Sequence, residues 1–164
     1  MVNVLDKVQP KNKEQLKQLI NYAFKHNIYN LNFIDTSEIS DMTWLFKYIS
    51  CNFDISNWNV SHVVDMSQMF YNCKNFNVDL SQWNVSNVTD MHSMFTLCEN
   101  FKGKGLENWD VSNVTTMSGM FNKCYNFNCD LSKWNVSNVE NMSYMFVWCD
   151  KITIPNWYKL YRRK

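Results

Sequence analysis

The stretch that decides the fold is WNVSNVTDMHSMFTLCENFKGKGLEN, residues 83–108. Three further copies have the same pattern: WNVSHVVDMSQMFYNCKNFNVDLSQ from Trp58, WDVSNVTTMSGMFNKCYNFNCDLSK from Trp109 and WNVSNVENMSYMFVWCDKITIPN from Trp134. A degenerate first copy, IDTSEISDMTWLF, begins at Ile34. Successive starts are 24, 25, 26, 25 and 23 residues apart, the last interval ending at Trp157. A period of this length predicts a repeat protein in which each unit packs on its neighbours.

Each repeat contains two apolar patterns. Residues 88–98 carry apolar side chains at helical spacing, and Ser86, Asn87 and Thr89 stand before them as candidate helix caps. Residues 76–80 alternate apolar and polar side chains, which is the period of a strand. One short strand and one helix cannot bury their own apolar faces, whereas stacked copies can. We therefore predict an α/β solenoid, a right-handed leucine-rich-repeat-like array of about five strand-plus-helix repeats with an N-terminal capping helix.

The predicted organisation has three parts. Residues 1–33 form an N-terminal cap with a helix over about 11–26 and a first strand, residues 34–156 form the five repeats, and residues 157–164 form a C-terminal cap with a basic tail. Stacking places equivalent residues in columns, which we expect to fill the core. The column of large side chains that opens each repeat consists of Ile34, Trp58, Trp83, Trp109, Trp134 and Trp157.

Composition and charge exclude several classes of protein. With 164 residues, three Gly, two Pro and 16% aromatic residues, the chain is neither collagen-like nor disordered. The net charge is +1, but acids outnumber bases in residues 30–156, so we expect no nucleic-acid partner. The basic residues of 157–164 are interpreted as a solubilising end, with contact to phosphate or lipid as the alternative.

The sequence shows no targeting or membrane segment. No apolar run reaches the ~20 residues that a membrane helix needs, so we expect no membrane span. The beginning, MVNVLDKVQPKNKEQ, lacks a basic start followed by an apolar stretch. We expect a cytoplasmic protein, or one at the cell surface or secreted if a leader has been removed.

The consensus W-N/D-V-S-N-V-T-x-M-S-x-M-F-x-x-C, followed by F-N-x-D-L-S-x-W, closely resembles the BspA-like leucine-rich repeat. It is most similar to the variant common in mycoplasma surface lipoproteins, a domain of unknown function. The resemblance covers about residues 28–158 and implies the fold strongly and a binding role less strongly, because several such proteins are adhesins or surface antigens. It identifies no partner.

Cysteines, histidines and acids give no catalytic pattern. Cys73, Cys98, Cys124 and Cys149 lie one repeat apart, which fits buried free thiols, with disulfides or a metal site as alternatives. The three His occupy unrelated repeat positions, and the sequence contains no Gly-rich phosphate loop, GxSxG or HExxH motif. We predict that the protein is not an enzyme and binds no cofactor and no metal.

The outward residues of the predicted concave sheet are the first candidate binding surface. The third repeat of this surface is irregular: it has one extra residue and holds two of the three Gly of the chain, so a bulge is expected there. A column of acids one repeat apart favours a basic protein partner, although an ordinary solvated polar face is the alternative. The candidate residues are Asp54, Asp79, Ser81, Gly105, Glu107, Asp130 and Ser132.

A second candidate surface is aromatic. Trp44, Tyr144 and Trp148 stand where the inner repeats carry mostly polar residues, so they are either exposed interface anchors or packing for the caps. The sequence thus predicts a non-enzymatic, repeat-based module that binds a protein through its concave sheet face. The alternatives are an adhesin or antigen that binds host components, and an assembly protein. We expect a monomer, or weak self-association through the terminal repeats.

Overall fold

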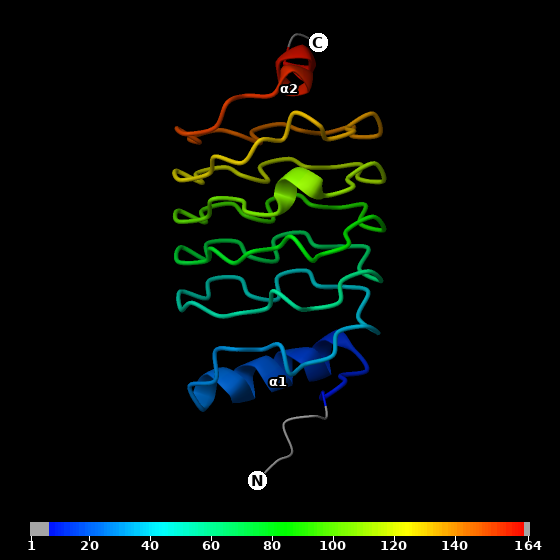
Figure 1. Ribbon diagram of the computed structural model, residues 1–164, viewed down its shortest axis with the longest axis vertical. Helices are drawn as coiled ribbons and strands as arrows, with labels where there is room; N and C mark the ends of the chain where they lie inside the picture. The colour runs from blue at the N-terminus through cyan, green and yellow to red at the C-terminus, as the bar shows by residue number, and fades with distance from the viewer. Residues whose placement is uncertain (1–6, 163–164) are drawn as a thin grey trace.

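The computed structural model describes residues 7–162, and it contains three short helices. Helix α1 spans Lys13–Lys25, the 3-10 helix η1 spans Leu106–Asn108, and helix α2 spans Asn156–Tyr161. Between α1 and α2 the chain winds in similar coils that stack on one another along the long axis (Figure 1). None of the three helices combines the length and the apolar character needed to cross a membrane.

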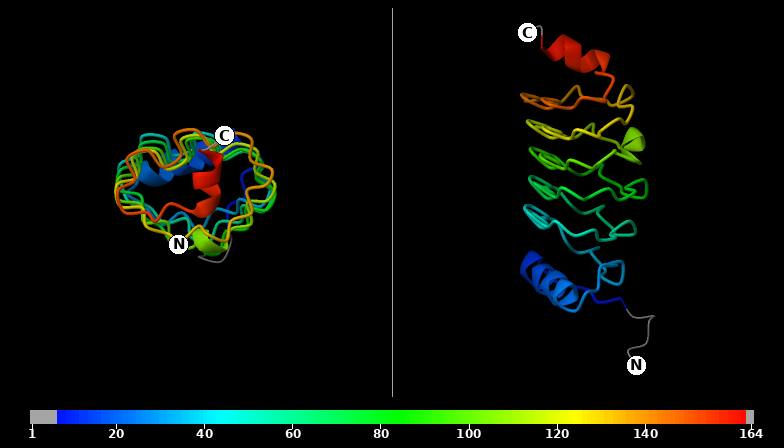
Figure 2. Two further views of the ribbon diagram at one scale, coloured as in Figure 1. Left: turned by 90° about the horizontal axis from the view of Figure 1, so that it is seen from above. Right: turned by 90° about the vertical axis from the view of Figure 1, so that its left-hand side faces the viewer.

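The coils correspond to the sequence repeats. We number them 1 to 5 by their first residues, Ile34, Trp58, Trp83, Trp109 and Trp134. Isolated parallel bridges join each coil to the next at equivalent positions: Asp41 to Asp65, Asp65 to Asp90, Asp90 to Thr116 and Thr116 to Asn141. Viewed from above, the coils superpose in one oval outline, and viewed from the side they stack nearly straight (Figure 2).

The predicted α/β solenoid of leucine-rich type is wrong. Within residues 7–162 there is no strand, and the only helical turn inside the repeats is η1. Residues 66–73, expected as a helix, instead form two successive β-turns, closed by Met69 N–H to the Met66 carbonyl (3.2 Å) and Cys73 N–H to the Phe70 carbonyl (2.9 Å). Gln68 and Asn72 have φ of 54° and 59° as the third residues of these turns. Consecutive turns of this kind place a side chain inward at every third or fourth residue, which is also the spacing of the buried residues of a helix.

Backbone groups in these turns are paired between coils. The amides of alternate residues donate to the next coil: Met66 to Asp90 (3.0 Å), Gln68 to His92 (2.9 Å), Phe70 to Met94 (3.0 Å) and Asn72 to Thr96 (2.8 Å). This ladder gives the buried backbone N–H and C=O groups hydrogen-bond partners without forming a regular sheet. The strand predicted at residues 76–80 is not formed either, although Phe76 and Leu80 are buried.

The residues predicted as helix caps have other roles. Ser86 N–H donates to the Asn84 side chain (3.1 Å), Asn87 Nδ2 donates to the Ser61 carbonyl (2.7 Å), and Thr89 Oγ1 donates to the Val64 carbonyl (3.3 Å). The last two bonds cross from one coil to the preceding one. These side chains therefore connect coils and cap no helix.

The core consists of aromatic columns along the stack. Trp58, Trp83, Trp109 and Trp134 are buried, as predicted, and the rings of Trp83 and Trp109 stack with centroids 6.3 Å apart. A parallel phenylalanine column has centroid separations of 5.4 to 5.8 Å between neighbouring members, which are Phe46, Phe70, Phe95, Phe121 and Phe146. Stacking at such distances adds to the free energy of burying each ring.

The two ends of the stack are covered. Helix α1 lies within the predicted range 11–26, begins after Asn12, whose side chain accepts from Gln15 N–H (3.0 Å), and buries Leu16, Ile20 and Ala23. At the other end α2 lies across the last coil (Figure 2), and Tyr158 packs edge-on against Phe146 at 4.9 Å. The covered ends keep apolar columns of coils 1 and 5 from water.

Replacing Trp109 with Ala should lower the free energy of unfolding by about 3–5 kcal/mol, because a buried ring is lost together with the hydrogen bond from its indole N–H to the Leu80 carbonyl. Chemical denaturation checks this value. The control is Tyr22→Ala, since Tyr22 lies exposed on α1. Equal, small losses for both variants would show that the tryptophan column is not a core element.

Candidate functional site

Three of the predicted acids form local turns with the chain itself. The carboxylates of Asp54, Asp79 and Asp130 each accept the backbone N–H two residues ahead, at 2.9, 3.0 and 2.9 Å. Two of the donors are the backbone N–H groups of Ser81 and Ser132, which were themselves predicted as binding residues in the column next to the acids. These Asx turns explain why Asp-x-Ser recurs at this position, whatever the residues bind.

Gly105 does not point outward as predicted. It is buried with φ of 95°, and a Cβ there would lie 2.2 Å from the Ser81 backbone nitrogen. Gly103, also at positive φ, approaches the Phe127 ring in the same way. Glu107 is exposed, and its carboxylate accepts the Gly105 N–H (3.0 Å). In the irregular coil a Glu carboxylate thus accepts a nearby backbone N–H, as the Asp carboxylates do in the other coils.

Next to this irregular coil the surface is hollowed. A groove of about 380 Å³ is lined by Lys102, Gly103, Lys104, Glu107, Asn128, Cys129 and Asp130. A second hollow of about 280 Å³, which also includes Lys151 and Thr153, shares Asn128, Cys129 and Asp130 with it. The structure therefore brings Glu107 and Asp130 together at one groove, while Asp54 lies at a separate hollow beside Tyr29.

The acidic column is partly neutralised inside the protein. Lys104 Nζ lies 2.7 Å from Asp79 Oδ2, and this hydrogen bond, with that of the Ser81 backbone, lowers the pKa of Asp79 to about 2. The pKa of Lys104 is raised by the same pair. At the groove, hydrogen bonds from Ser132 lower the pKa of the exposed Asp130. The groove thus offers carboxylates beside ammonium groups, not the uniformly acidic column that the sequence suggested.

The lysines of the groove were not predicted. Lys102 and Lys104 flank Gly103 in the 26-residue repeat, and this insertion was the signal that marks the site. Cys129 also lies there; its Sγ is 3.4 Å from Glu107 Oε2, and burial together with that carboxylate raises its pKa to about 12. A thiol with a raised pKa is a poor nucleophile at neutral pH.

The predicted aromatic residues are exposed. Trp44, Tyr144 and Trp148 all have positive φ at the turns of coils 1 and 5. More than half of each side chain is exposed to solvent, so none of the three is buried beneath a cap. They lie at opposite ends of the stack and form no single cluster. Tyr144 also borders a hollow of about 450 Å³ between the last coil and α2.

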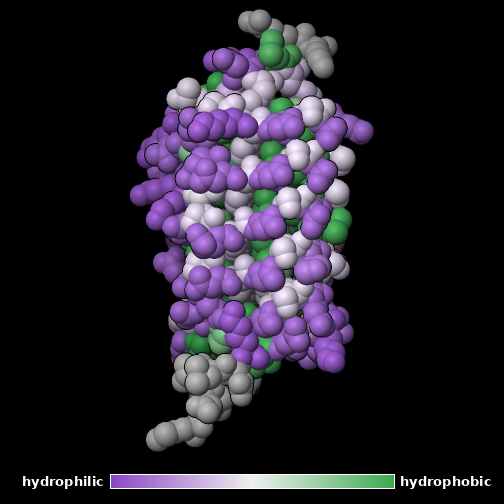
Figure 3. Space-filling view, turned by 45° about the vertical axis from the view of Figure 1, so that its right-hand side comes forward, coloured by the Kyte–Doolittle hydropathy of each residue, from purple (hydrophilic) through white to green (hydrophobic). Residues whose placement is uncertain are grey.

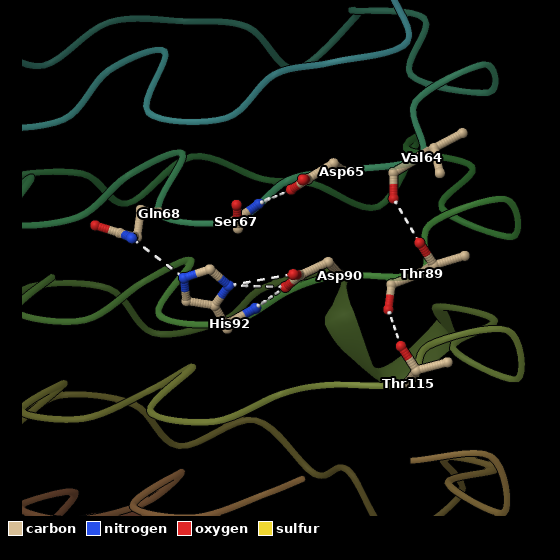
Figure 4. Close-up of polar contacts among 8 residues, drawn as sticks. All are labelled: Val64, Asp65, Ser67, Gln68, Thr89, Asp90, His92 and Thr115. Carbon is tan, nitrogen blue, oxygen red and sulfur yellow. Dashed lines mark hydrogen bonds and ion pairs between the residues drawn. The ribbon is translucent and has the colours of Figure 1, made fainter. Parts of the chain in front are cut away.

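His92 bridges two coils. Its Nδ1 lies 3.0 Å from Asp90 Oδ1 and its Nε2 lies 3.1 Å from Gln68 Nε2 (Figure 4). Asp90 and Gln68 therefore fix the tautomer with the proton on Nδ1, because the Gln68 amide donates to Nε2. Since both ring nitrogens are engaged, the side chain serves the contact between coils 2 and 3.

The repeated cysteines lie against the preceding coil. The thiols of Cys73, Cys98, Cys124 and Cys149 donate to phenylalanine carbonyls one coil back, at 2.7 to 3.0 Å. Burial raises the pKa of Cys73 and of Cys149 to about 12. In residues 7–162 no three His, Cys, Asp or Glu side chains are placed to hold a metal ion.

We predict that the native protein without reductant has six free thiols. Cys98 and Cys124 should not react with a thiol reagent at pH 8, because they are buried and their pKa values are raised well above 9. After denaturation all six should react. Titration that finds fewer than six groups would establish disulfides.

The surface of the stack is striped. Figure 3 shows hydrophilic residues gathered in columns along the long axis, with less hydrophilic residues between them. Equivalent positions of successive coils thus present similar chemistry in lines, and departures from the repeat interrupt these lines.

Gly105→Ala should destabilise the protein by at least about 2 kcal/mol, because a Cβ meets backbone atoms of coil 2 and the left-handed φ disfavours it. Gly119→Ala is the matched change: φ is also positive, but its nearest contact is the Ser93 hydroxyl at 3.2 Å. We expect a loss near 1 kcal/mol for that variant, measured by urea denaturation. A larger loss of stability for Gly119→Ala than for Gly105→Ala would contradict the close backbone contact at Gly105.

Comparison with known proteins identifies a family and nothing more. No curated protein matches the chain, and no solved structure matches it. The model of a family described as "Mycoplasma protein of unknown function, DUF285" matches residues 13–105 and residues 82–158. The match does not confirm the leucine-rich repeat assignment. Because it covers most of the sequence, the chain belongs to this Mycoplasma protein family of unknown function, DUF285.

Proposed function

We propose that the protein is a non-enzymatic binding module that takes a segment of another protein in the groove beside η1. The observation that supports this proposal is the interruption of the repeat at coil 3, where an extra residue and two glycines at positive φ accompany a groove of about 380 Å³. Coil 3 lies in the middle of the stack, so a bound segment has surface to contact on both sides.

The charges of the groove favour a partner segment with a basic side chain. Lys104 is paired with Asp79. Glu107 and Asp130 are exposed, and neither takes part in an ion pair within residues 7–162. Lys102 and Lys151 at the rim suit acidic or carbonyl groups of the same segment. Mixed charges of this kind give specificity and register to a protein contact. They are unsuited to a nucleic acid, which needs a continuous basic surface.

The resemblance of the repeats to BspA-like proteins supports the same class of function, since several of those proteins are adhesins or surface antigens. A role in binding host components would use the same groove. It would also require a place outside the cell.

The experiment compares capture of proteins from the native host by the wild type and by Glu107→Gln/Asp130→Asn. Asn makes the same Asx turn elsewhere in this chain, at Asn84 and Asn141, so the variant should keep its fold. We expect the partner to be captured about tenfold less well by the variant, and captured less by the wild type as salt is raised.

The matched control is Asp110→Asn. Asp110 forms the same turn with Ser112 (3.0 Å), and hydrogen bonds lower its pKa as they do for Asp130, but it does not line the groove. A photo-crosslinking residue at Lys102 should label the partner captured by the wild type. Equal loss with Asp110→Asn, or a partner that is not labelled from position 102, contradicts the proposal.

A further inference from the structure

Ten residues at positive φ, all third residues of the turns in coils 1 to 5, form two columns on one side of the stack, which we call the turn face. In each coil two turn residues have φ between 54° and 68°. The first column contains Trp44, Gln68, Ser93, Gly119 and Tyr144, and the second contains Tyr48, Asn72, Leu97, Lys123 and Trp148. All four aromatic members belong to coils 1 and 5, and the six members in coils 2 to 4 include none.

The local structure does not explain these four aromatic side chains. A left-handed φ is unfavourable for bulky residues and suits Gly or Asn, as at Gly119 and Asn72. Burial does not offset this cost, because Trp44 is 55% exposed, Tyr48 60%, Tyr144 71% and Trp148 62%. Strained residues that leave large rings in solvent are typical of contact surfaces.

Two rings of coil 1 and one ring of coil 2 gather around Lys47. Lys47 Nζ lies 5.2 Å from the Trp44 ring centre, 5.3 Å from that of Tyr48 and 5.0 Å from that of Tyr71. In coil 5 the equivalent of Lys47 is Val147, which is itself 38% exposed. Coil 1 therefore presents aromatic rings with a cation, and coil 5 presents aromatic rings with an aliphatic side chain.

We propose that the turn face joins two copies of this chain in an antiparallel, two-fold symmetric dimer. Coils 1 and 5 are equally far from coil 3, so a two-fold axis that crosses the stack at coil 3 places coil 1 of each copy against coil 5 of the other. Trp44 then meets Tyr144 of the second copy, and Tyr48 meets Trp148 of the second copy. A surface that complements itself in this way is the requirement for an isologous dimer.

Charge selects the antiparallel arrangement. A parallel dimer would set Lys47 against Lys47 of the second copy, which is repulsive. The antiparallel dimer sets the Lys47 ammonium against the rings of coil 5, where cation–π attraction extends the one already made within coil 1. End-to-end association is disfavoured, because α1 and α2 cover the two ends of the stack (Figure 1).

The area is sufficient for a dimer at the small end of the stable range. Four aromatic residues of about 150–250 Å² each, exposed to the fractions given, offer roughly 500 Å² per copy. Two copies would bury about 1,000 Å² from these side chains alone, and specific interfaces bury about 1,200–2,000 Å² in total. The side chains of coils 2 to 4, with Leu97 at the centre, supply the remainder.

Sedimentation velocity over a range of protein concentrations tests the proposal. The wild type should dimerise reversibly, and Trp44→Asn/Trp148→Asn should raise the dimer Kd at least tenfold. Because Asn tolerates a positive φ, thermal unfolding of the monomeric variant should be unchanged or raised. The control, Tyr22→Gln/Tyr125→Asn, removes two aromatic residues exposed elsewhere and should dimerise as the wild type does.

Photo-crosslinking from position 68 tests the orientation. In the antiparallel dimer coil 2 faces coil 4, so the crosslinked peptide of the second copy should come from residues 117–124. A crosslink to residues 66–73 would overturn the antiparallel arrangement. The proposal would be overturned if the wild type stayed monomeric at every accessible concentration. It would also be overturned if the Trp44→Asn/Trp148→Asn variant dimerised as well as the wild type. None of these results depends on the groove beside η1.

Discussion

The indole N–H of each column tryptophan donates to a backbone carbonyl 26 to 29 residues earlier in the chain, and this bond holds the stack in register. Trp58 donates to Leu31, Trp83 to Ile55, Trp109 to Leu80, Trp134 to Leu106 and Trp157 to Leu131, at 2.8 to 3.2 Å. A shift of one coil by one residue would leave an indole N–H buried without a partner, and a buried donor without an acceptor costs more than one hydrogen bond contributes. The cysteine thiols repeat the same arrangement at the other side of the core.

This constraint explains what could be predicted from the sequence. The tryptophan repeat requires equivalent residues to lie above one another, so the buried column and the N-terminal helix near residues 11–26 were predictable. The strand and the helix of each repeat were not, because consecutive turns place Met66, Met69, Phe70 and Cys73 inward at the spacing of a helix. Except for Gly119, the third turn residues, such as Gln68, are not Gly, so the usual signal of a left-handed turn was missing from most repeats.

The candidate site was predictable only in part. The irregular third repeat marked the place of the groove, and Gly105 in it does permit a close approach of two backbones. The acids were chosen for their alternation in an assumed strand, whereas Asp54, Asp79 and Asp130 recur because each closes a turn. A repeated residue in a stacked protein first has to satisfy the stack, so residues that break the repeat are the better guide to function.

The hydrogen bonds of the ladder have a consequence for how the protein opens. The backbone ladder bonds each coil to its immediate neighbours, so the stability of a coil depends on nearest-neighbour contacts that are complete in the middle of the stack and incomplete toward the ends. We therefore expect local opening to begin at the terminal coils and to move inward, with amide hydrogen exchange slowing from coils 1 and 5 toward coil 3. Coil 3, which carries the groove, would then be the best protected of the coils, while the aromatic side chains of the turn face lie on the coils that open first.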